Sequence, residues 1–259
     1  MTSEPARRVA ALYDVHGNLP ALEAALADAD ANDAEMLVFG GDLALGPMPV
    51  EVLDTVASLG ARALSLRGNC DRLMVDAFDD RPLPSSLPPA VRESIGWAAA
   101  QLSRDHRDFL AALPETLTID VAGVGPVLCC HATPRSDDEI FTVRTPDERI
   151  RPMFANVHEA VVVCGHTHMQ FQRRLGELLV VNAGSVGMPF GVAGAHWLLL
   201  GPEIEPRRTT YGEARAVERI ARTSYPEASA FAERSVLHPP SEEQMLAAFE
   251  PPRAAGPTP

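Results

Sequence analysis

The chain has 259 residues, of which 46% are hydrophobic and 22% charged, a composition typical of a globular protein large enough to fold as one α/β domain. Its formal net charge of −13 and its lack of lysine disfavour an extended nucleic-acid groove, because such grooves need basic side chains to neutralise phosphates. No apolar run approaches the ~20 residues that cross a bilayer, the first residues lack a secretion signal, and the four cysteines form no CxxC pair. A cytoplasmic protein that does not engage a membrane is therefore expected.

The first part of the chain predicts alternating strands and helices. Apolar runs at 8–13, 36–39 and 61–66 have the character of buried strands, and the segments between them, 19–31 and 49–59, carry apolar residues at helical spacing. This rhythm indicates parallel strands joined by helical crossovers. The dipeptide Gly68-Asn69 after the third strand is interpreted as a turn.

Further on, helices are predicted at 90–102 and 103–113, with Ser103 as the cap of the second. Short apolar runs bounded by turn residues then predict strands at 116–121, 126–130, 160–164, 171–175, 178–182, 197–200 and 204–211. The polar stretch 132–146 has the length of a functional loop. The end of the chain predicts short helices and then a proline-rich disordered tail, at 213–223, 228–234, 241–249 and 251–259.

Seven polar side chains with metal-binding chemistry follow the predicted strands near glycines: Asp14, His16, Asp42, Asn69, His131, His166 and His168. No single segment could build a site from them, so a sheet must gather them at one edge. Side chains two residues apart on a strand point the same way, which would align the two members of each D-x-H or H-x-H pair. Carboxylate and imidazole ligands together suit Mn, Fe, Co, Ni or Zn.

Taken singly, most of these groups also have an ordinary structural explanation. Asp14 and His16 fit a capping carboxylate beside a turn histidine, Asn69 fits a left-handed turn, and an isolated His131 is more often a structural histidine than a ligand. The segment 166–168 is the strongest single indication, since two imidazoles at a strand end are costly to bury without partners.

Taken together and in this order, the motifs D-x-H, G-D, G-N-x-[DE], H and G-H-T-H resemble those of the calcineurin-like metallophosphoesterase superfamily, over about 8–211. The segments 67–71 (RGNCD) and 182–187 (NAGSVG) look like those of its small bacterial phosphodiesterase branch. The resemblance implies an α/β fold, a four-layer α/β/β/α sandwich over 1–211, with a short helical extension over 212–250 packed on it.

The resemblance also assigns the ligands of two divalent metal ions. It implies Asp14, His16 and His168 at the first ion, Asn69, His131 and His166 at the second, and Asp42 as the bridge. Two divalent ions and two aspartates leave a surplus of positive charge, so the site would attract phosphate inside an acidic protein. The hypothesis is a phosphodiesterase that hydrolyses a small phosphodiester or phosphorylated metabolite by attack of a metal-bridging hydroxide, with Asp42 and His131 at the reacting centre.

Cys70 departs from the pattern of many phosphatases in the superfamily, which have a histidine directly after the asparagine. A thiol is a weak hydrogen-bond donor with a pKa of ~8.5, so Cys70 is a doubtful catalytic residue. This departure makes a phosphomonoesterase or a protein serine/threonine phosphatase the second choice. A thiol that only fills space near the site explains Cys70 equally well.

Three residues near the ligands are candidates for substrate binding. Arg72 and Arg135 flank ligand-bearing loops and suit a bidentate clamp on phosphate, and Asn18 suits either substrate contact or the bracing of its own turn. His196 is placed just before a predicted strand and receives no role. A non-catalytic metal-binding scaffold and a nuclease are further alternatives, disfavoured by the full ligand set and by the acidic charge. The sequence leaves a homo-oligomer open.

Overall fold

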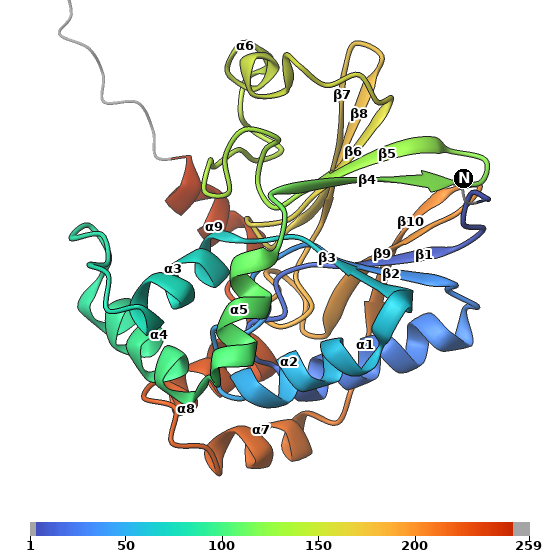
Figure 1. The fold of residues 1–259 in the computed structure, drawn as a ribbon. Coiled ribbons are helices and arrows are strands. Elements are labelled where there is room, and N and C mark those ends of the chain that lie inside the picture. Colours follow the sequence, from blue (N-terminus) through green and yellow to red (C-terminus); the bar gives the residue numbers. More distant parts are fainter. Residues whose placement is uncertain (1–3, 251–259) are drawn as a thin grey trace, which may run out of the picture.

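The computed structural model describes residues 4–250, which form two five-stranded sheets packed face to face (Figure 1). The first sheet has the order β10-β9-β1-β2-β3, with β1 (Val9–Leu12), β2 (Met36–Phe39), β3 (Ala63–Ser65), β9 (Ala195–Leu200) and β10 (Ile204–Thr209). The second has the order β4-β5-β6-β8-β7, with β4 (Thr116–Val121), β5 (Gly125–Cys130), β6 (Val161–Cys164), β7 (Gln170–Leu175) and β8 (Leu178–Ala183).

Each sheet contains three parallel strands with antiparallel strands beside them. In the first sheet β1, β2 and β3 are parallel, and in the second β5, β6 and β8 are parallel. The strands β9, β10, β4 and β7 pair antiparallel with their neighbours. The segments that follow the carboxyl ends of five of these parallel strands carry all seven predicted ligands, and Asn69 among them is the first residue of a helix.

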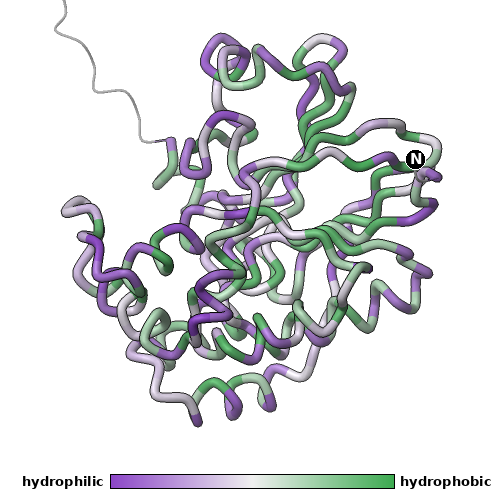
Figure 2. The backbone as a smooth tube through the Cα atoms, viewed as in Figure 1, coloured by the Kyte–Doolittle hydropathy of each residue, from purple (hydrophilic) through white to green (hydrophobic). Residues whose placement is uncertain are grey.

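The alternation of side chains in β1 shows how the first sheet is buried on both faces. Ala10 and Leu12 join the apolar cluster under the helices, whereas Ala11 joins the cluster between the sheets. Tyr13 extends this second cluster and donates its hydroxyl to the carbonyl of Val163 in the other sheet, at 3.1 Å. The hydrophobic strands accordingly run through the interior of the molecule (Figure 2).

Helices cover the outer face of the first sheet and all contribute to its apolar cluster: α1 (Leu19–Ala31), α2 (Pro49–Ser58), α3 (Asn69–Phe78), α4 (Pro89–Gln101) and α5 (Arg104–Ala112). The short helix α6 (Asp147–Ile150) and the 3-10 helix η2 (Arg151–Phe154) cover the outer face of the second sheet. The predicted four-layer sandwich is therefore confirmed.

The last described segments are α7 (Glu213–Ala221), α8 (Ala228–Phe231), the π-helix η3 (Ala232–Leu237) and α9 (Glu242–Phe249). Side chains of α7, α8 and η3 belong to the cluster under the first sheet. The helix α9 instead contacts the loops 142–149 and 188–191. Among residues 4–250, no helix combines the length and apolar character needed to span a bilayer.

Several local predictions were wrong. The Gly68-Asn69 turn is the beginning of α3, because the carboxylate of Asp71 accepts the Gly68 N–H and starts a helix there. The helical segment 147–154 was not predicted. His196 lies inside β9, paired with Arg208, rather than before a strand. The tail predicted for 251–259 lies outside the described residues.

Candidate metal centre

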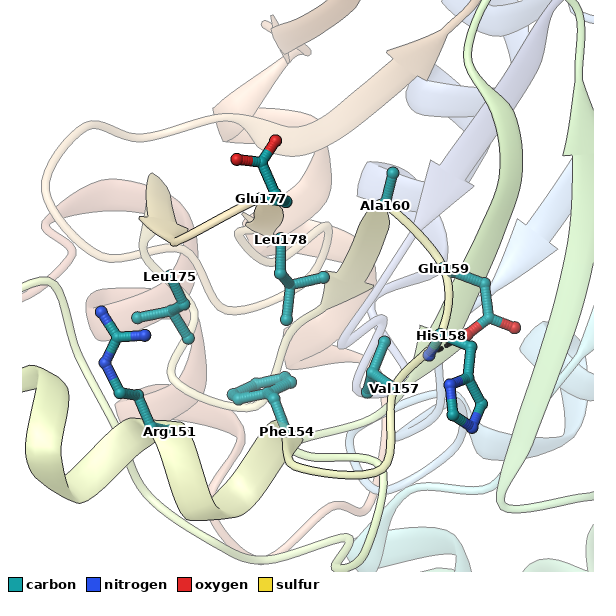
Figure 3. A pocket seen from close by; sticks show the side chains of 9 residues that line it. All are labelled: Arg151, Phe154, Val157, His158, Glu159, Ala160, Leu175, Glu177 and Leu178. Atoms are coloured by element: carbon teal, nitrogen blue, oxygen red, sulfur yellow. Dashed lines mark hydrogen bonds between the residues drawn. The ribbon is translucent and has the colours of Figure 1, made fainter.

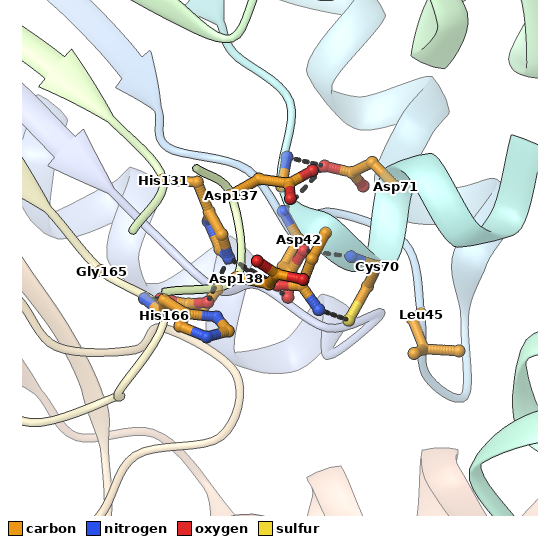
Figure 4. A network of polar contacts seen from close by, with 12 residues as sticks. Asp42, Leu45, Cys70, Asp71, His131, Asp137, Asp138, Gly165 and His166 are labelled. Carbon is orange, nitrogen blue, oxygen red and sulfur yellow. Dashed lines mark hydrogen bonds and ion pairs between the residues drawn. The ribbon is translucent and has the colours of Figure 1, made fainter. Parts of the chain in front are cut away.

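The seven predicted ligands lie together where the two sheets meet. Five of them are buried and two, Asn69 and His166, are half-buried. Figure 4 shows His131 and His166 beside Asp42, although the two histidines and the aspartate come from different sheets. The sequence therefore identified the members of the cluster.

A first set of ligands surrounds the carboxylate of Asp14. Its Oδ1 lies 3.4 Å from Nε2 of His168 and 3.8 Å from Nε2 of His16, and the two imidazole nitrogens are 3.2 Å apart. The potential ligand atoms of these three residues all lie within 4.8 Å of one another. This is the set that the resemblance assigns to the first ion.

A second set lies around His131. Its Nε2 is 3.0 Å from Oδ1 of Asn69, and its ring centroid is 5.1 Å from that of His166. Asp42 lies between the two sets, because its Oδ2 is 3.7 Å from Nε2 of His16 and 3.5 Å from Nε2 of His131. The carboxylate of Asp42 is thus placed to contribute a ligand to both sets.

Hydrogen bonds to the backbone fix which imidazole nitrogen is free. In three rings Nδ1 lies beside a carbonyl oxygen: His16 beside Leu45 at 3.3 Å, His131 beside Gly40 at 2.8 Å, and His168 beside Met188 at 2.8 Å. A carbonyl oxygen only accepts, so each Nδ1 carries a proton, and Nε2 is the nitrogen that bears the lone pair whenever the ring is neutral. Each lone pair points into the cluster.

When these rings are neutral, as metal ligation requires, lone pairs face one another at two places, His16 against His168 and His131 against Asn69. Beside them, Oδ1 of Asp14 is buried and has no hydrogen-bond partner within residues 4–250. Facing acceptors with no proton between them repel, whereas a cation between them turns each contact into ligation. The donor set therefore fits a metal ion at each of the two places.

Charges within the cluster shift the pKa values of its members. Burial disfavours the charged form of every group, and together with His131 it lowers the pKa of His166 to about 4. Burial also acts on His131, but the nearby Asp42 and Asp14 outweigh it and raise the pKa of His131 to about 10. Burial of Asp42 is in turn outweighed by His131 and His16, which hold its pKa well below the ordinary value. The carboxylate of Asp42 stays ionised and attracts positive charge.

Five of the seven ligands do not sit on extended backbone, which corrects the expectation from strand alternation. Asp14, His16, Asp42, His166 and His168 have φ between 48° and 67°, in the left-handed region. Side chains other than glycine enter this region at a cost of about 1–2 kcal/mol per residue. Backbone strain of this kind clusters at functional sites, where the surrounding structure imposes it.

The model for the calcineurin-like phosphoesterase superfamily domain matches residues 8–201. The chain belongs to this superfamily. Membership implies a metal-dependent phosphoric ester hydrolase, and all seven of the ligands described above lie within the matched residues. The predicted family is confirmed.

Three relatives cover most of the chain. The uncharacterised protein MJ0912 of Methanocaldococcus jannaschii is 27% identical over 85% of this chain and 94% of its own length. The solved structure of the hypothetical protein PH1004 from Pyrococcus horikoshii has a TM-score of 0.77 at 19% identity, over 90% of this chain and 99% of that one. A metallophosphoesterase from Sphaerobacter thermophilus has a TM-score of 0.70 at 24% identity, over 88% and 98%. These two structures share the fold.

Asp71 supports the site, although the RGNCD motif alone did not indicate a role for this residue. Its buried carboxylate accepts the backbone N–H groups of Asp42 at 2.8 Å, Leu43 at 2.9 Å and Gly68 at 2.9 Å (Figure 4). These bonds tie the loop after β2 to the beginning of α3. Asp71 thereby fixes the backbone of Asp42, the residue between the two ligand sets.

Cys70 lies against the same centre. Its backbone N–H donates to Oδ1 of Asp42 at 2.8 Å, and its sulfur, with His16 and Asp42, forms a group of potential ligand atoms within 4.8 Å of one another. Burial and the charge of Asp42 raise the pKa of the Cys70 thiol well above its usual value. The backbone of this residue holds Asp42, while its side chain stays a neutral thiol.

The predicted substrate contact by Asn18 is wrong. The side chain of Asn18 is fully buried, where it caps α1 by accepting the N–H of Ala21 at 3.3 Å. It also donates to the carbonyl of Gly187 at 2.9 Å and lies 3.4 Å from the hydroxyl of Tyr211. Asn18 therefore braces its own turn, which was the alternative interpretation.

The two candidate arginines are engaged by carboxylates. Arg72 donates to both oxygens of Asp137, at 2.7 and 2.9 Å. Arg135 pairs with Glu139 and lines a hollow of about 320 Å³ that contains none of the ligands. The structure thus contradicts a phosphate clamp by Arg135. Arg72 lies near the centre, but its guanidinium is not free in this structure.

A larger hollow of about 440 Å³, drawn in Figure 3, also lies away from the metal centre. It is lined by Phe154, Val157 and Leu178, among others, with Arg151 and Glu177 at its rim. The segment 157–160 that lines it precedes β6, whereas His166 and His168 follow β6. This hollow therefore plays no part in assembling the metal centre.

Proposed function

We propose that the protein is a phosphodiesterase with a dinuclear metal centre that acts on a small phosphodiester or phosphorylated metabolite. The position of Asp42 carries this proposal, because one carboxylate oxygen faces both His16 and His131 across less than 4 Å. A carboxylate in that position can be shared by two ions. The nitrogen and oxygen ligands suit Mn, Fe, Co, Ni or Zn.

When bound, divalent ions polarise a phosphoryl group and lower the pKa of water, so that it becomes a nucleophile at neutral pH. The protein's own residues position the ligand side chains. The carbonyls of Gly40 and Met188 set the ring tautomers, and Asp71 and the N–H of Cys70 hold Asp42. Such partners of the ligands keep the centre preorganised.

The preference for diesters rests on Cys70. A monoester with a poor leaving group gains from an imidazole that donates a proton or binds the dianionic phosphate. A thiol at that position donates weakly, so substrates that need such help should react slowly. The small bacterial phosphodiesterase branch that the segments 67–71 and 182–187 resemble agrees with this preference.

The test is to compare hydrolysis of bis-p-nitrophenyl phosphate and p-nitrophenyl phosphate by the purified protein with Mn²⁺, Ni²⁺, Co²⁺ or Zn²⁺. We expect faster diester hydrolysis, lost in Asp42→Asn and retained in Asp76→Asn, a surface control. In H₂¹⁸O the label should enter the phosphate-bearing product, whereas a trapped phosphorylated residue would contradict direct attack by water. Faster monoester hydrolysis would favour a phosphomonoesterase, and a metal-loaded but inert protein would favour a scaffold.

A further inference from the structure

The helix α9 touches a loop that supports one of the metal ligands, although it lies far from that ligand in the chain. We propose that Phe190 and Phe249 are positioning residues, which hold the ring of His168 in its ion-binding orientation. The inference rests on the metal centre of the proposed function. It gives a role in that centre to a residue of the C-terminal extension.

The ring of His168 is held from two directions. Its Nδ1 donates to the carbonyl of Met188 at 2.8 Å, and its face stacks on the ring of Phe190 with centroids 5.1 Å apart and planes 24° apart. Phe190 in turn meets Phe249 at the end of α9, with ring centroids 6.3 Å apart. The three rings form a continuous row from the metal centre to α9.

The backbone keeps α9 in place beside this row. The N–H of Gly191, next to Phe190, donates to the carbonyl of Pro240 at 2.8 Å. Glu242, the first residue of α9, closes on Gly191, where an added Cβ would lie 3.0 Å from its side chain. The segment 188–191 is therefore contacted both by the beginning of α9 and by Phe249 at the end of α9.

A single hydrogen bond at Nδ1 leaves an imidazole free to tilt about that bond, whereas stacking fixes the plane of the ring. Without Phe249, the half-buried Phe190 could turn toward solvent and release His168. An aromatic contact of this kind contributes about 0.5–1.5 kcal/mol, which corresponds to about a two- to tenfold change in a dissociation constant. The loss should fall on the ion held by Asp14, His16 and His168, because His131 and Asn69 do not contact this row.

The chain offers a matched control next to Phe249. Glu250 bonds Thr142 at 3.5 Å, Arg149 at 3.1 Å and also Thr145, so it ties the same end of α9 to the loop 142–149. These side-chain partners of Glu250 lie outside the aromatic row. Glu250→Gln therefore weakens the ionic tie between this end of α9 and Arg149 while leaving the three rings together.

The experiment is calorimetric titration of the metal-free, full-length protein with Mn²⁺, alongside urea unfolding without metal. We expect Phe249→Ala to weaken one of two Mn²⁺ sites by about three- to tenfold, Phe249→Tyr to bind like the unsubstituted protein, and Glu250→Gln to keep both affinities. Phe249→Leu, which keeps apolar bulk but loses the ring, should fall between them. It also serves as the test if Phe249→Ala does not fold.

Unchanged affinities in Phe249→Ala and Phe249→Leu, or equal weakening by Glu250→Gln, would overturn the positioning role. In both cases the unsubstituted protein would still bind two ions, so the metal centre on which the proposed function rests would be unaffected. If the unsubstituted protein bound no Mn²⁺, the proposed function itself would fail. The two failures are thus distinguishable in one set of titrations.

Discussion

Replacing Asp71 with asparagine tests whether a buried carboxylate outside the ligand set holds the metal centre together. One oxygen of Asp71 accepts the N–H groups of Asp42 and Gly68, and the other accepts that of Leu43. Asparagine offers only one oxygen. Wherever its amide oxygen is placed, its NH₂ group must face at least one backbone N–H.

The cost follows from these three bonds. An N–H left buried without an acceptor costs about 1–3 kcal/mol. Burial and the charge of Asp42 raise the pKa of Asp71 to about 7, so its carboxylate is ionised above that pH. The two bonds that survive in Asp71→Asn are neutral, and bonds to an ionised acceptor are about twice as strong as neutral ones. We therefore expect Asp71→Asn to lower the free energy of unfolding by roughly 2–5 kcal/mol. The backbone of Asp42 should shift as well, which weakens metal binding.

The measurement is urea unfolding of the metal-free protein at about pH 8.5, where the Asp71 carboxyl is ionised, followed by titration with Mn²⁺. Asp76→Asn is the control on the same helix, because Asp76 pairs with Arg81 at the surface and such pairs contribute at most about 1 kcal/mol. If Asp71→Asn were no less stable than this control and bound Mn²⁺ normally, the role assigned to Asp71 would be refuted.

Three further predictions test packing, pH dependence and metal linkage. Gly165→Ala should destabilise by about 1–3 kcal/mol in thermal unfolding, since its Cβ would lie 2.5 Å from Oδ2 of Asp14, whereas Gly96→Ala in open space should not. Burial lowers the pKa of His196 to about 4, so in acid the unfolded chain takes up a proton that the folded one resists. Between pH 6.5 and 4, the unfolding free energy of the unsubstituted protein should therefore fall by about 3 kcal/mol more than that of His196→Asn. Parallel curves of unfolding free energy against pH for the two proteins would contradict this. Mn²⁺ at 100 times its dissociation constant should raise the unfolding free energy by about 2.7 kcal/mol per site, and no rise would mean that the folded state binds no Mn²⁺.

The sequence was sufficient to predict the layers and to name the seven side chains that the fold brings together. Apolar runs that end at a ligand, directly as at Asp14 or after two glycines as at Asp42, reflect strands buried on both faces, and this pattern is local. The order of the ligand motifs then identified the superfamily and its fold. Helical periodicity likewise located α1, α2, α4 and α5 to within two residues.

What the sequence could not predict depends on contacts between distant residues. The capping of α3 by Asp71, the left-handed backbone at His166, and the carbonyl partner of His168 appear only when the loops meet. Arg135 seemed available for phosphate because its partner Glu139 lies in an irregular loop with no predictable geometry. The packing of α9 could not be predicted either, because the N-cap residue Ser241 marks where the helix begins but not what the helix packs against.

The most direct test of the dinuclear centre is anomalous scattering from crystals of the protein grown with Mn²⁺. We expect two ions, one among Asp14, His16 and His168 and the other beside His131, with the carboxylate of Asp42 within ligand distance of both. A single ion, or two ions that leave Asp42 uncoordinated, would contradict the account.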